Sequence, residues 1–334
     1  MTDTRKPATI KEIARQLNVS VSTVSRALRD HPGIGLRTRQ RVQALAAQLN
    51  YEPNQAAISF KQGRTRTIGL IVPNLREEFF CMAIQAVEEL AQQQGYTVLI
   101  GQSHDRPAKE REVLDSMRRN RVDGVLISLA KDTREYGLFD DLKQYGLPVV
   151  FFDRVPAGQL YHGVRCNLAS ASSELVDLLA ERGHTHIGFI NGPATLAAAA
   201  EREQGIKAAA ARHPGMEIVL TDTGLASHAT RIAMKQLLAR EVRPTAVITF
   251  NDYVALEAMA YCREHGLTIN EDISFVSYAH LSFMRYLERG LLASVEQFPA
   301  EQGKAATELL LRMVEGGEGV TAGYQVLEAK LIVN

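Results

Sequence analysis

The strongest constraint on the fold is an alternation that begins at Thr67 and continues through the rest of the 334-residue chain. Short runs rich in β-branched and aromatic residues recur, separated by segments in which apolar residues follow a helical period. Their spacing of about 25 to 30 residues is typical of repeated βα units. We therefore predict an α/β fold with parallel sheets covered by helices. Nine runs are expected to be strands: "TIGLIVP", "YTVLIGQ", "DGVLISL", "PVVFFD", "HIGFING", "EIVLTD", "TAVITF", "DISFVSY" and "LASVEQ".

Several polar and aromatic side chains follow the carboxyl ends of these strands, where ligands bind in sheets of this kind. Aromatic faces combined with Asp, Asn and Arg side chains are the usual lining for a sugar or a similar polar ring. The candidates are Phe79, Phe80, Asp153, Arg154, Arg202, Asn251, Asp252 and Gln297.

Several of these candidates also have a purely structural explanation. Phe79 and Phe80 open an amphipathic segment and could pack into a core. The run "NDYVAL" could cap a helix, since Asn and Asp are good N-cap residues. Arg202 lies in "AAAAEREQGIKAAA", where an exposed helix with i, i+4 ion pairs would account for it.

The segment before Thr67 predicts a separate small helical head. Two stretches carry apolar residues at i, i+3, i+4 and i+7: Ile10 to Leu17, and Val42 to Leu49. Between them, Ser20 is a candidate N-cap, and Val24 with Leu28 form an i, i+4 pair. Three short helices sharing one core are expected.

The charge distribution separates the head from the body. Residues 1–66 hold 12 Lys and Arg against 4 Asp and Glu, and the remainder holds 26 against 34, so a formal net charge of zero divides into +8 and −8. A basic head on an acidic body suggests that the head binds nucleic acid.

The outer face of the middle helix is expected to carry that activity, although a simple solvated face would look similar. Short residues on its first turn let a helix end enter the major groove, where Val can touch a thymine methyl group and Arg can reach guanine O6 and N7. The residues concerned are Val21, Ser22, Ser25, Arg26 and Arg29.

Other functional classes find no support in the sequence. Cys81, Cys166 and Cys262 are isolated, which predicts neither a disulfide framework nor a zinc site. No phosphate-binding glycine loop, nucleophile elbow or cofactor motif occurs, so no catalytic residue, metal or cofactor is expected. Asp153 and Asp252 could form a carboxylate pair for sugar hydrolysis, which keeps a glycosidase as a minor alternative. The sequence shows neither a signal peptide nor a membrane-length apolar run, and a cytoplasmic protein is expected.

At its N-terminal end the chain closely resembles the lactose/galactose repressor (LacI/GalR) family of bacterial transcriptional regulators. The resemblance is carried by "ATIKEIARQLNVSVSTVSRALRDHPGI" and "TRQRVQALAAQLNYEPN". It implies a helix-turn-helix head in which Val21, Ser22 and Arg26 read bases. It also implies that Thr9, Ser20, Thr23 and Ser25 hold phosphates or cap the helix.

The resemblance extends over the body, which looks like a periplasmic sugar-binding protein with two lobes, three crossovers and an effector between them. It places Phe80, Asp153, Arg202, Asn251, Asp252 and Gln297 on effector-contacting positions, with Phe79 a neighbour. Two positions depart from the family: Ala279 stands where Asp is common, and Leu196 where some members carry Arg. With Arg154, Arg202 and His280 nearby, an anionic ligand such as a sugar acid or sugar phosphate is a hypothesis; His280 could equally be a surface or capping residue.

The segment "YEPNQAAISFKQG" is interpreted as a hinge helix capped by Asn54 and ended by Gly63. The resemblance implies that such a helix orders on the operator, pairs with its twin and inserts a side chain into the minor groove. That side chain is usually Leu and is Phe60 here, a residue type able to unstack a base step. Ala57 would permit close approach of the twin helices and Lys61 would meet a phosphate; the alternative is a spacer with Phe60 packed on the body.

Together these observations predict a helix-turn-helix domain over 1–53, a hinge over 54–66 and an effector-binding, dimerising body over 67–334. Within the body, 67–167 with 298–320 are expected to form the N-lobe, and 168–297 with 321–334 the C-lobe. The predicted function is ligand-controlled binding of a near-palindromic operator by a homodimer, with a sugar or sugar derivative as effector and repression as the outcome. A cytoplasmic sugar-binding protein without a regulatory role is the alternative.

Overall fold

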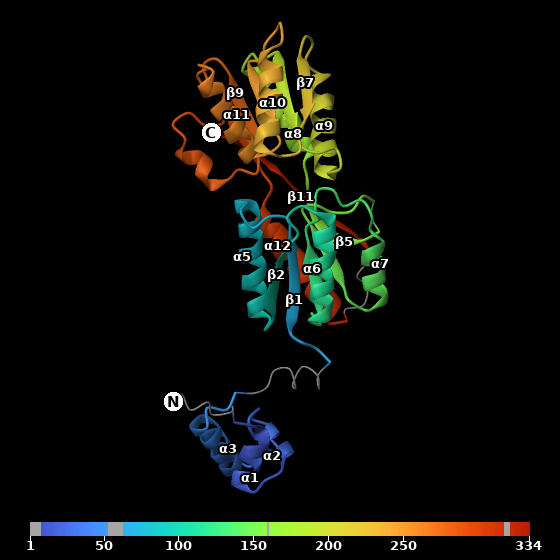
Figure 1. The fold of residues 1–334 in the computed structure, drawn as a ribbon, viewed down its shortest axis with the longest axis vertical. Helices are drawn as coiled ribbons and strands as arrows, with labels where there is room; N and C mark the ends of the chain where they lie inside the picture. The colour runs from blue at the N-terminus through green and yellow to red at the C-terminus, as the bar shows by residue number, and fades with distance from the viewer. Residues whose placement is uncertain (1–7, 53–62, 159, 317–320) are drawn as a thin grey trace. The chain divides into compact units, whose positions relative to one another are not determined.

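The computed structural model describes residues 8–52, 63–158, 160–316 and 321–334. The chain divides into two compact units, with the boundary between Thr65 and Arg66. The predicted hinge residues Asn54, Ala57, Phe60 and Lys61 lie outside the described residues. The elements of both units are labelled in Figure 1.

The head contains the three expected helices, α1 (Ile10–Leu17), α2 (Val21–Ala27) and α3 (Leu36–Gln48). Asn18 ends α1 in the left-handed conformation, with φ 51°, and so makes the tight turn into α2. One small core joins the three helices through Ile13, Ala14, Val24, Ala27, Val42 and Ala46. The apolar residues that recur with the predicted helical period are therefore the ones that pack in this core.

The body contains two six-stranded sheets in which all pairings are parallel except that of β10 with β12. The first has the order β11-β5-β4-β3-β1-β2 and the second β12-β10-β9-β8-β6-β7. The first sheet comprises β1 (Thr67–Val72), β2 (Thr97–Gln102), β3 (Gly124–Ile127), β4 (Val149–Phe152), β5 (His162–Asn167) and β11 (Gly323–Glu328). The second comprises β6 (His186–Asn191), β7 (Glu217–Asp222), β8 (Ala246–Thr249), β9 (Ser274–Tyr278), β10 (Ala293–Glu296) and β12 (Lys330–Val333).

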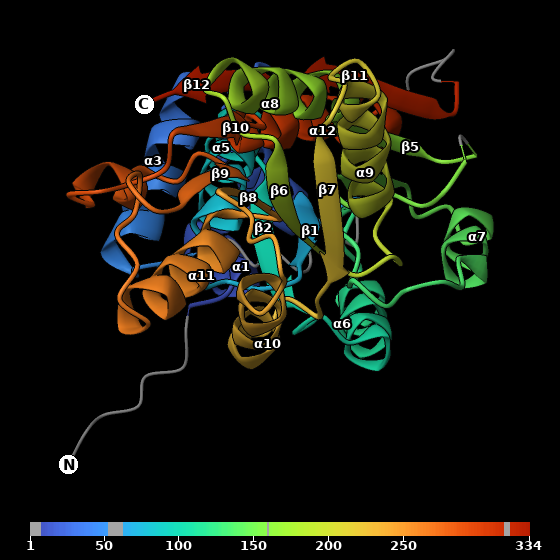
Figure 2. The same ribbon diagram turned by 90° about the horizontal axis from the view of Figure 1, so that it is seen from above.

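Helices cover both faces of each sheet. In the N-lobe they are α5 (Glu78–Gln93), α6 (Pro107–Arg119), α7 (Gly137–Gln144) and α12 (Pro299–Val314). In the C-lobe they are α8 (Ala169–Glu181), α9 (Ala197–Ala210), α10 (Ser227–Leu238) and α11 (Asp252–Glu264), with a 3₁₀ turn η1 (Ser282–Tyr286). Figure 2 shows α8 and α9 on one side of the second sheet and α10 and α11 on the other.

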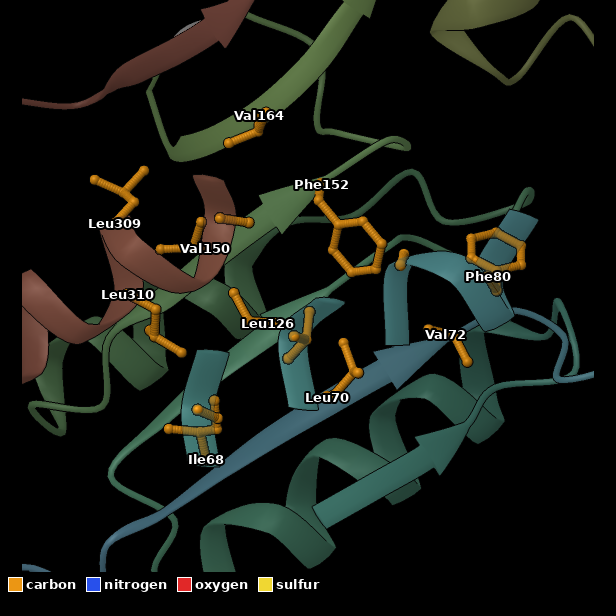
Figure 3. Close-up of a cluster of buried hydrophobic side chains, with 14 of the residues drawn as sticks. Ile68, Leu70, Val72, Phe80, Leu126, Val150, Phe152, Val164, Leu309 and Leu310 are labelled. Carbon is orange, nitrogen blue, oxygen red and sulfur yellow. The ribbon is translucent and has the colours of Figure 1, made fainter. Parts of the chain in front are cut away.

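Alternate residues of the interior strand β1 enter different cores. Ile68, Leu70 and Val72 join a cluster with α5 and α12, which Figure 3 shows together with Phe80, Phe152 and Leu310. Ile71 joins the cluster on the opposite face, beneath α6 and α7. Because both faces are buried, the strand is a continuous apolar run, as expected of a parallel sheet.

The chain crosses between the lobes after β5, after β10 and after β11. The expected lobe boundaries are wrong in one place. Residues 321–334 were assigned to the C-lobe, but β11 pairs with β5 in the N-lobe sheet, and only β12 joins the C-lobe sheet through β10. All nine predicted strands are present, whereas β5, β11 and β12 were missed. Among the described residues, no helix combines the length and apolar character that a membrane span requires.

Candidate functional site

The first turn of α2 carries a cluster of hydroxyl groups. The Ser20 Oγ accepts a hydrogen bond of 3.0 Å from the Thr23 N–H, which confirms Ser20 as the N-cap. The same oxygen lies 2.7 Å from the Ser22 Oγ and 2.8 Å from the Thr23 Oγ1. Thr9 caps α1 in the same manner by accepting from the Glu12 N–H at 3.3 Å. These caps fix the backbone at the start of both helices.

The exposed face of α2 is cationic. Val24 and Ala27 point into the core, whereas Val21, Ser22, Arg26 and Arg29 are exposed, Val21 to 42%. Thr23 and Ser25 are half-buried. Within the described residues neither Arg26 nor Arg29 makes an ion pair, since the nearby carboxylate of Asp30 faces Arg39. The face therefore offers two uncompensated guanidinium groups to an anionic partner.

In the body, a cleft between the two lobes lies at the carboxyl ends of the strands. It brings together seven of the nine predicted effector residues: Phe79, Phe80, Asp153, Arg154, Arg202, Asn251 and Gln297. Its open volume is about 50 Å³. Ligand pockets usually offer roughly 300–1,000 Å³, so the cleft in this conformation is too small for a ring-sized ligand.

On the N-lobe side, Asp153 and Arg154 follow β4. The backbone N–H of Asp153, at φ 58°, donates to the Val164 O at 3.0 Å, while its carboxylate accepts from the Ser128 Oγ at 3.2 Å. Burial raises the pKa of Asp153 although Arg154 and Arg202 act in the opposite direction. The Arg154 guanidinium is bound to the carboxylate of Asp105 and lies over the Phe80 ring.

On the C-lobe side, Arg202 is 3% exposed and stacks between two rings. Its guanidinium carbon lies 4.0 Å from the centre of the Phe250 ring and 4.4 Å from that of Tyr278. Its Nη2 donates to the Gln297 Oε1 at 3.4 Å, a long hydrogen bond. Burial lowers the pKa of Arg202 to about 10. The exposed-helix explanation for Arg202 is therefore wrong.

Some cleft residues also have structural roles. Asn251 is the N-cap of α11, and its Oδ1 accepts from the Val254 N–H at 3.0 Å, which leaves its amide NH₂ for other partners. Phe79 and Phe80 meet edge to face at 5.3 Å, and both belong to the N-lobe core. Asn251, Phe79 and Phe80 therefore stabilise the fold and also line the cleft.

Two predicted residues do not line the cleft. Asp252 is fully buried, and its carboxylate accepts from the Leu281 N–H at 2.7 Å and the Ser294 Oγ at 3.2 Å. It fixes the backbone that follows β9. His280, at φ 50°, donates its N–H to the Ser294 Oγ at 3.0 Å and is absent from the lining. Asp153 and Asp252 consequently do not form a carboxylate pair facing one space.

Comparison with known proteins decides the family. Residues 9–54 match the bacterial regulatory proteins of the lacI family, and residues 68–318 match the periplasmic binding protein domain. The transcriptional repressor PurR of Vibrio atlanticus is 32% identical over 310 residues, which cover 92% of each chain. The chain belongs to the lacI family.

Solved structures of lacI-family proteins share the fold. The lac repressor dimer bound to operator and an anti-inducer superposes with a TM-score of 0.86 over 98% of both chains, at 24% identity. The complex of the regulator CelR with cellobiose gives a TM-score of 0.71 at 26% identity, also over 98% of both chains. The predicted fold class, a helix-turn-helix head with a two-lobed α/β body, is confirmed.

In this lacI-family chain the cleft also contains residues that sequence reasoning missed or did not place there. They are Glu77, Ala198, Phe250, Tyr253 and Leu281; Leu196 and Ala279, the two positions that depart from the family, line the cleft as well. Phe250 and Tyr253 flank the predicted pair Asn251 and Asp252, so the end of "VITF" was a usable signal. Nothing in the sequence marks Glu77, because it lies several residues beyond β1.

Metal binding finds no support in the described parts of the chain, where no group of three or more His, Cys, Asp or Glu side chains could hold an ion. Cys166 and Cys262 are buried and Cys81 is exposed. Burial raises the pKa of both buried thiols to about 12, so neither is a reactive thiolate at neutral pH.

Proposed function

We propose that this lacI-family chain is a transcriptional repressor whose affinity for operator DNA is controlled by a small molecule, a sugar or sugar derivative, bound in the interlobe cleft. The cleft is the observation that carries the proposal, because aromatic rings and hydrogen-bonding groups from both lobes line one space. A relative of 26% identity was solved with cellobiose, which supports a carbohydrate ligand.

The head would read DNA through α2. Val21, Ser22 and Arg26 are proposed to contact base edges, because they are exposed on a short helix whose opposite face is buried. Thr9, Ser20, Thr23, Ser25 and Arg29 would hold phosphates or fix the helix end. One such head covers only a half-site, so a homodimer on a near-palindromic operator is expected.

Ligand would act by changing how the lobes close. Several contacts already join the lobes, among them Tyr253 with Glu78, Ser282 with Glu78, Lys131 with the Gly224 carbonyl and Arg165 with Glu201. An effector can shift DNA affinity only through its different affinities for the open and closed bodies. The cleft's small volume supports coupling between ligand entry and lobe separation.

Residues 54–66 are proposed to be the hinge that transmits this change, and this part of the proposal rests on the sequence alone. Asn54 would begin the helix, Ala57 would allow close approach of its twin and Lys61 would contact a phosphate. Phe60 would enter the minor groove as an apolar wedge.

The decisive experiment is selection of bound DNA from a random pool with the full chain, followed by gel-shift of the selected sequence in the presence of a carbohydrate panel. We expect a near-palindromic consensus, and at least one ligand that changes its affinity. A chain lacking residues 1–66 should bind no DNA while retaining the ligand. Failure to enrich any sequence would contradict the proposal.

Experiments on the same full-length and truncated chains distinguish the proposed function from two others. A cytoplasmic sugar-binding protein without a regulatory role would bind ligand but select no DNA. A glycosidase would release a chromogenic aglycone. The separate placement of Asp153 and Asp252 argues against the glycosidase, as do relatives that are transcriptional repressors. A DNA-binding regulator acts in the cytoplasm, and this is the proposed location.

A further inference from the structure

Arg202 is a buried cation whose hydrogen-bonding capacity is largely unused. Its Nε and Nη1 are buried and have no hydrogen-bond partner, although the side chain lines the cleft. Its Nη2 donates to the Gln297 Oε1, and this hydrogen bond is long at 3.4 Å. A guanidinium group has five N–H donors and no acceptor, so only an external acceptor can complete this set.

The two arginines of the cleft differ in this respect. Arg154 is bound to Asp105, and its Nε lies 4.0 Å from the Asp153 carboxylate. Within the described residues, no carboxylate lies within ion-pairing distance of Arg202. The residue after Tyr278, Ala279, also lines the cleft and contributes only a methyl group. Arg202 is thus the one arginine lining the cleft, among the described residues, that makes no ion pair, although the more distant carboxylates of Asp153 and Glu201 favour its charged form.

The surroundings hold Arg202 in place for a ligand. Stacking between Phe250 and Tyr278 fixes the guanidinium plane, and the Tyr278 hydroxyl is itself held 2.6 Å from the Ser172 Oγ. Cation–π contacts on both faces stabilise the charge but leave the N–H edge unsatisfied. With a pKa of about 10, the group remains charged at neutral pH. A fixed planar fork of this kind matches a carboxylate.

We infer that the effector carries a carboxylate and that Arg202 binds it, an inference that rests on the proposed effector function of the cleft. Glu77 and Asp153 line the same space and repel added negative charge. A carboxylate adds one charge, whereas a phosphate ester adds nearly two at neutral pH. The remaining lining of aromatic rings, Asn251 and Gln297 suits the ring and hydroxyl groups of a sugar acid.

The test is calorimetry on the full chain with matched ligands. Each acid is compared with its neutral counterpart: D-galacturonate with D-galactose and with the methyl ester of galacturonate, and D-glucuronate with D-glucose. D-glucose 6-phosphate supplies the phosphate arm. We expect at least one acid to bind tenfold or more tightly than its neutral counterparts and than the phosphate. Equal or tighter binding of the neutral sugars, tighter binding of the phosphate, or binding of none of the acids would overturn the inference.

Substitutions at Arg202 test whether this residue causes the preference for an acid over a neutral sugar. Arg202→Gln should reduce the ratio of acid to neutral affinity by tenfold or more, and Arg202→Lys should restore part of it, because lysine keeps the charge without the fork. Arg240→Gln is the matched control, because Arg240 pairs with Glu217 on the C-lobe surface. An unchanged ratio in a folded Arg202→Gln protein would contradict the assignment.

Binding to the selected operator shows whether the carboxylate inference fails alone or together with the proposed function. If a neutral sugar alters operator binding and no acid does, the proposed function stands and the carboxylate inference fails. If no operator is selected, the proposed function fails whatever the calorimetry gives.

Discussion

The phenolic oxygen of Tyr253 accepts a hydrogen bond of 3.0 Å from the backbone N–H of Glu78, which joins the C-lobe to the N-lobe at the edge of the cleft. Glu78 is the first residue of α5, so its N–H has no partner within the helix. The Glu78 carboxylate in turn accepts from the Ser282 N–H at 3.0 Å. One residue of the N-lobe thus makes two contacts with the C-lobe, and separation of the lobes at this edge would break both.

Tyr253→Phe should weaken the closed state, since it removes the acceptor for the Glu78 N–H and leaves the ring. A net loss of about 0.5–1.5 kcal/mol corresponds to an effector affinity raised roughly 2- to 10-fold, because the cleft between the closed lobes is too small for a ring-sized ligand. Calorimetry with the effector measures this, and hydrogen exchange at the start of α5 should become faster. Tyr145→Phe, at an exposed N-lobe tyrosine, is the control. No change in either measurement would show that the contact does not hold the lobes.

Arg26→Lys distinguishes base reading from phosphate contact. Lysine keeps the charge but cannot make the bidentate contact to guanine, which is worth about 1–3 kcal/mol of discrimination. We expect operator affinity to fall roughly 10- to 100-fold while affinity for scrambled DNA is nearly unchanged. Gel-shifts with both DNAs at fixed salt measure the two values. Equal affinities of the wild type and the variant for the operator would indicate a phosphate contact only.

Phe60→Ala tests the hinge hypothesis. Removing an apolar wedge should weaken specific operator binding far more than non-specific binding, because only the specific complex contains the kinked base step. Phe60→Leu, which restores the size and character of a wedge, should recover most of the affinity. Competitive gel-shifts against scrambled DNA report the ratio. A loss of equal size on both DNAs would instead support the spacer interpretation.

Asp252→Asn tests the buried carboxyl that orders the turn after β9. Burial raises the pKa of Asp252 from 3.8 to about 6 although hydrogen bonds from Leu281, Ser277 and Ser294 oppose the shift. A raised pKa in the folded state means that the native protein binds more protons than the unfolded chain between these values. The contribution to stability is therefore complete below about pH 4 and is lost as the pH rises through 6, by roughly 3 kcal/mol at most.

Asparagine does not titrate and can still accept from the Leu281 N–H. The unfolding free energy of the variant minus that of the wild type should therefore increase between pH 4 and 7, because only the wild type loses stability over this range. Denaturant unfolding at several pH values measures it. Asp222→Asn, on an exposed strand-end residue, is the control. A difference that does not vary with pH would show that Asp252 has no raised pKa.

The regular elements were predictable where burial and sequence period coincide. The apolar runs of β1, β3 and β8 are buried on both faces, so each is recognisable without knowledge of its neighbours. The missed strands are β5, "HGVRCN", and the edge strands β11 and β12: β5 and β11 mix polar with apolar residues, and β12, "KLIV", is only four residues long. Their strand conformation depends on pairing with partners far along the chain.

The sequence by itself determined the charge division between head and body, the helix caps at Thr9 and Ser20, the class of fold and the family. These follow from composition, local hydrogen bonding and short-range periodicity, which act within a few residues of the chain. Only the tertiary structure decided that β11 belongs to the N-lobe, that Asp252 supports a turn instead of facing the cleft, and that Arg202 is buried against two rings with two of its nitrogens lacking hydrogen-bond partners. Each of these depends on side chains brought together from distant segments, and the burial that sets their charge and hydrogen bonding exists only once the lobes have packed.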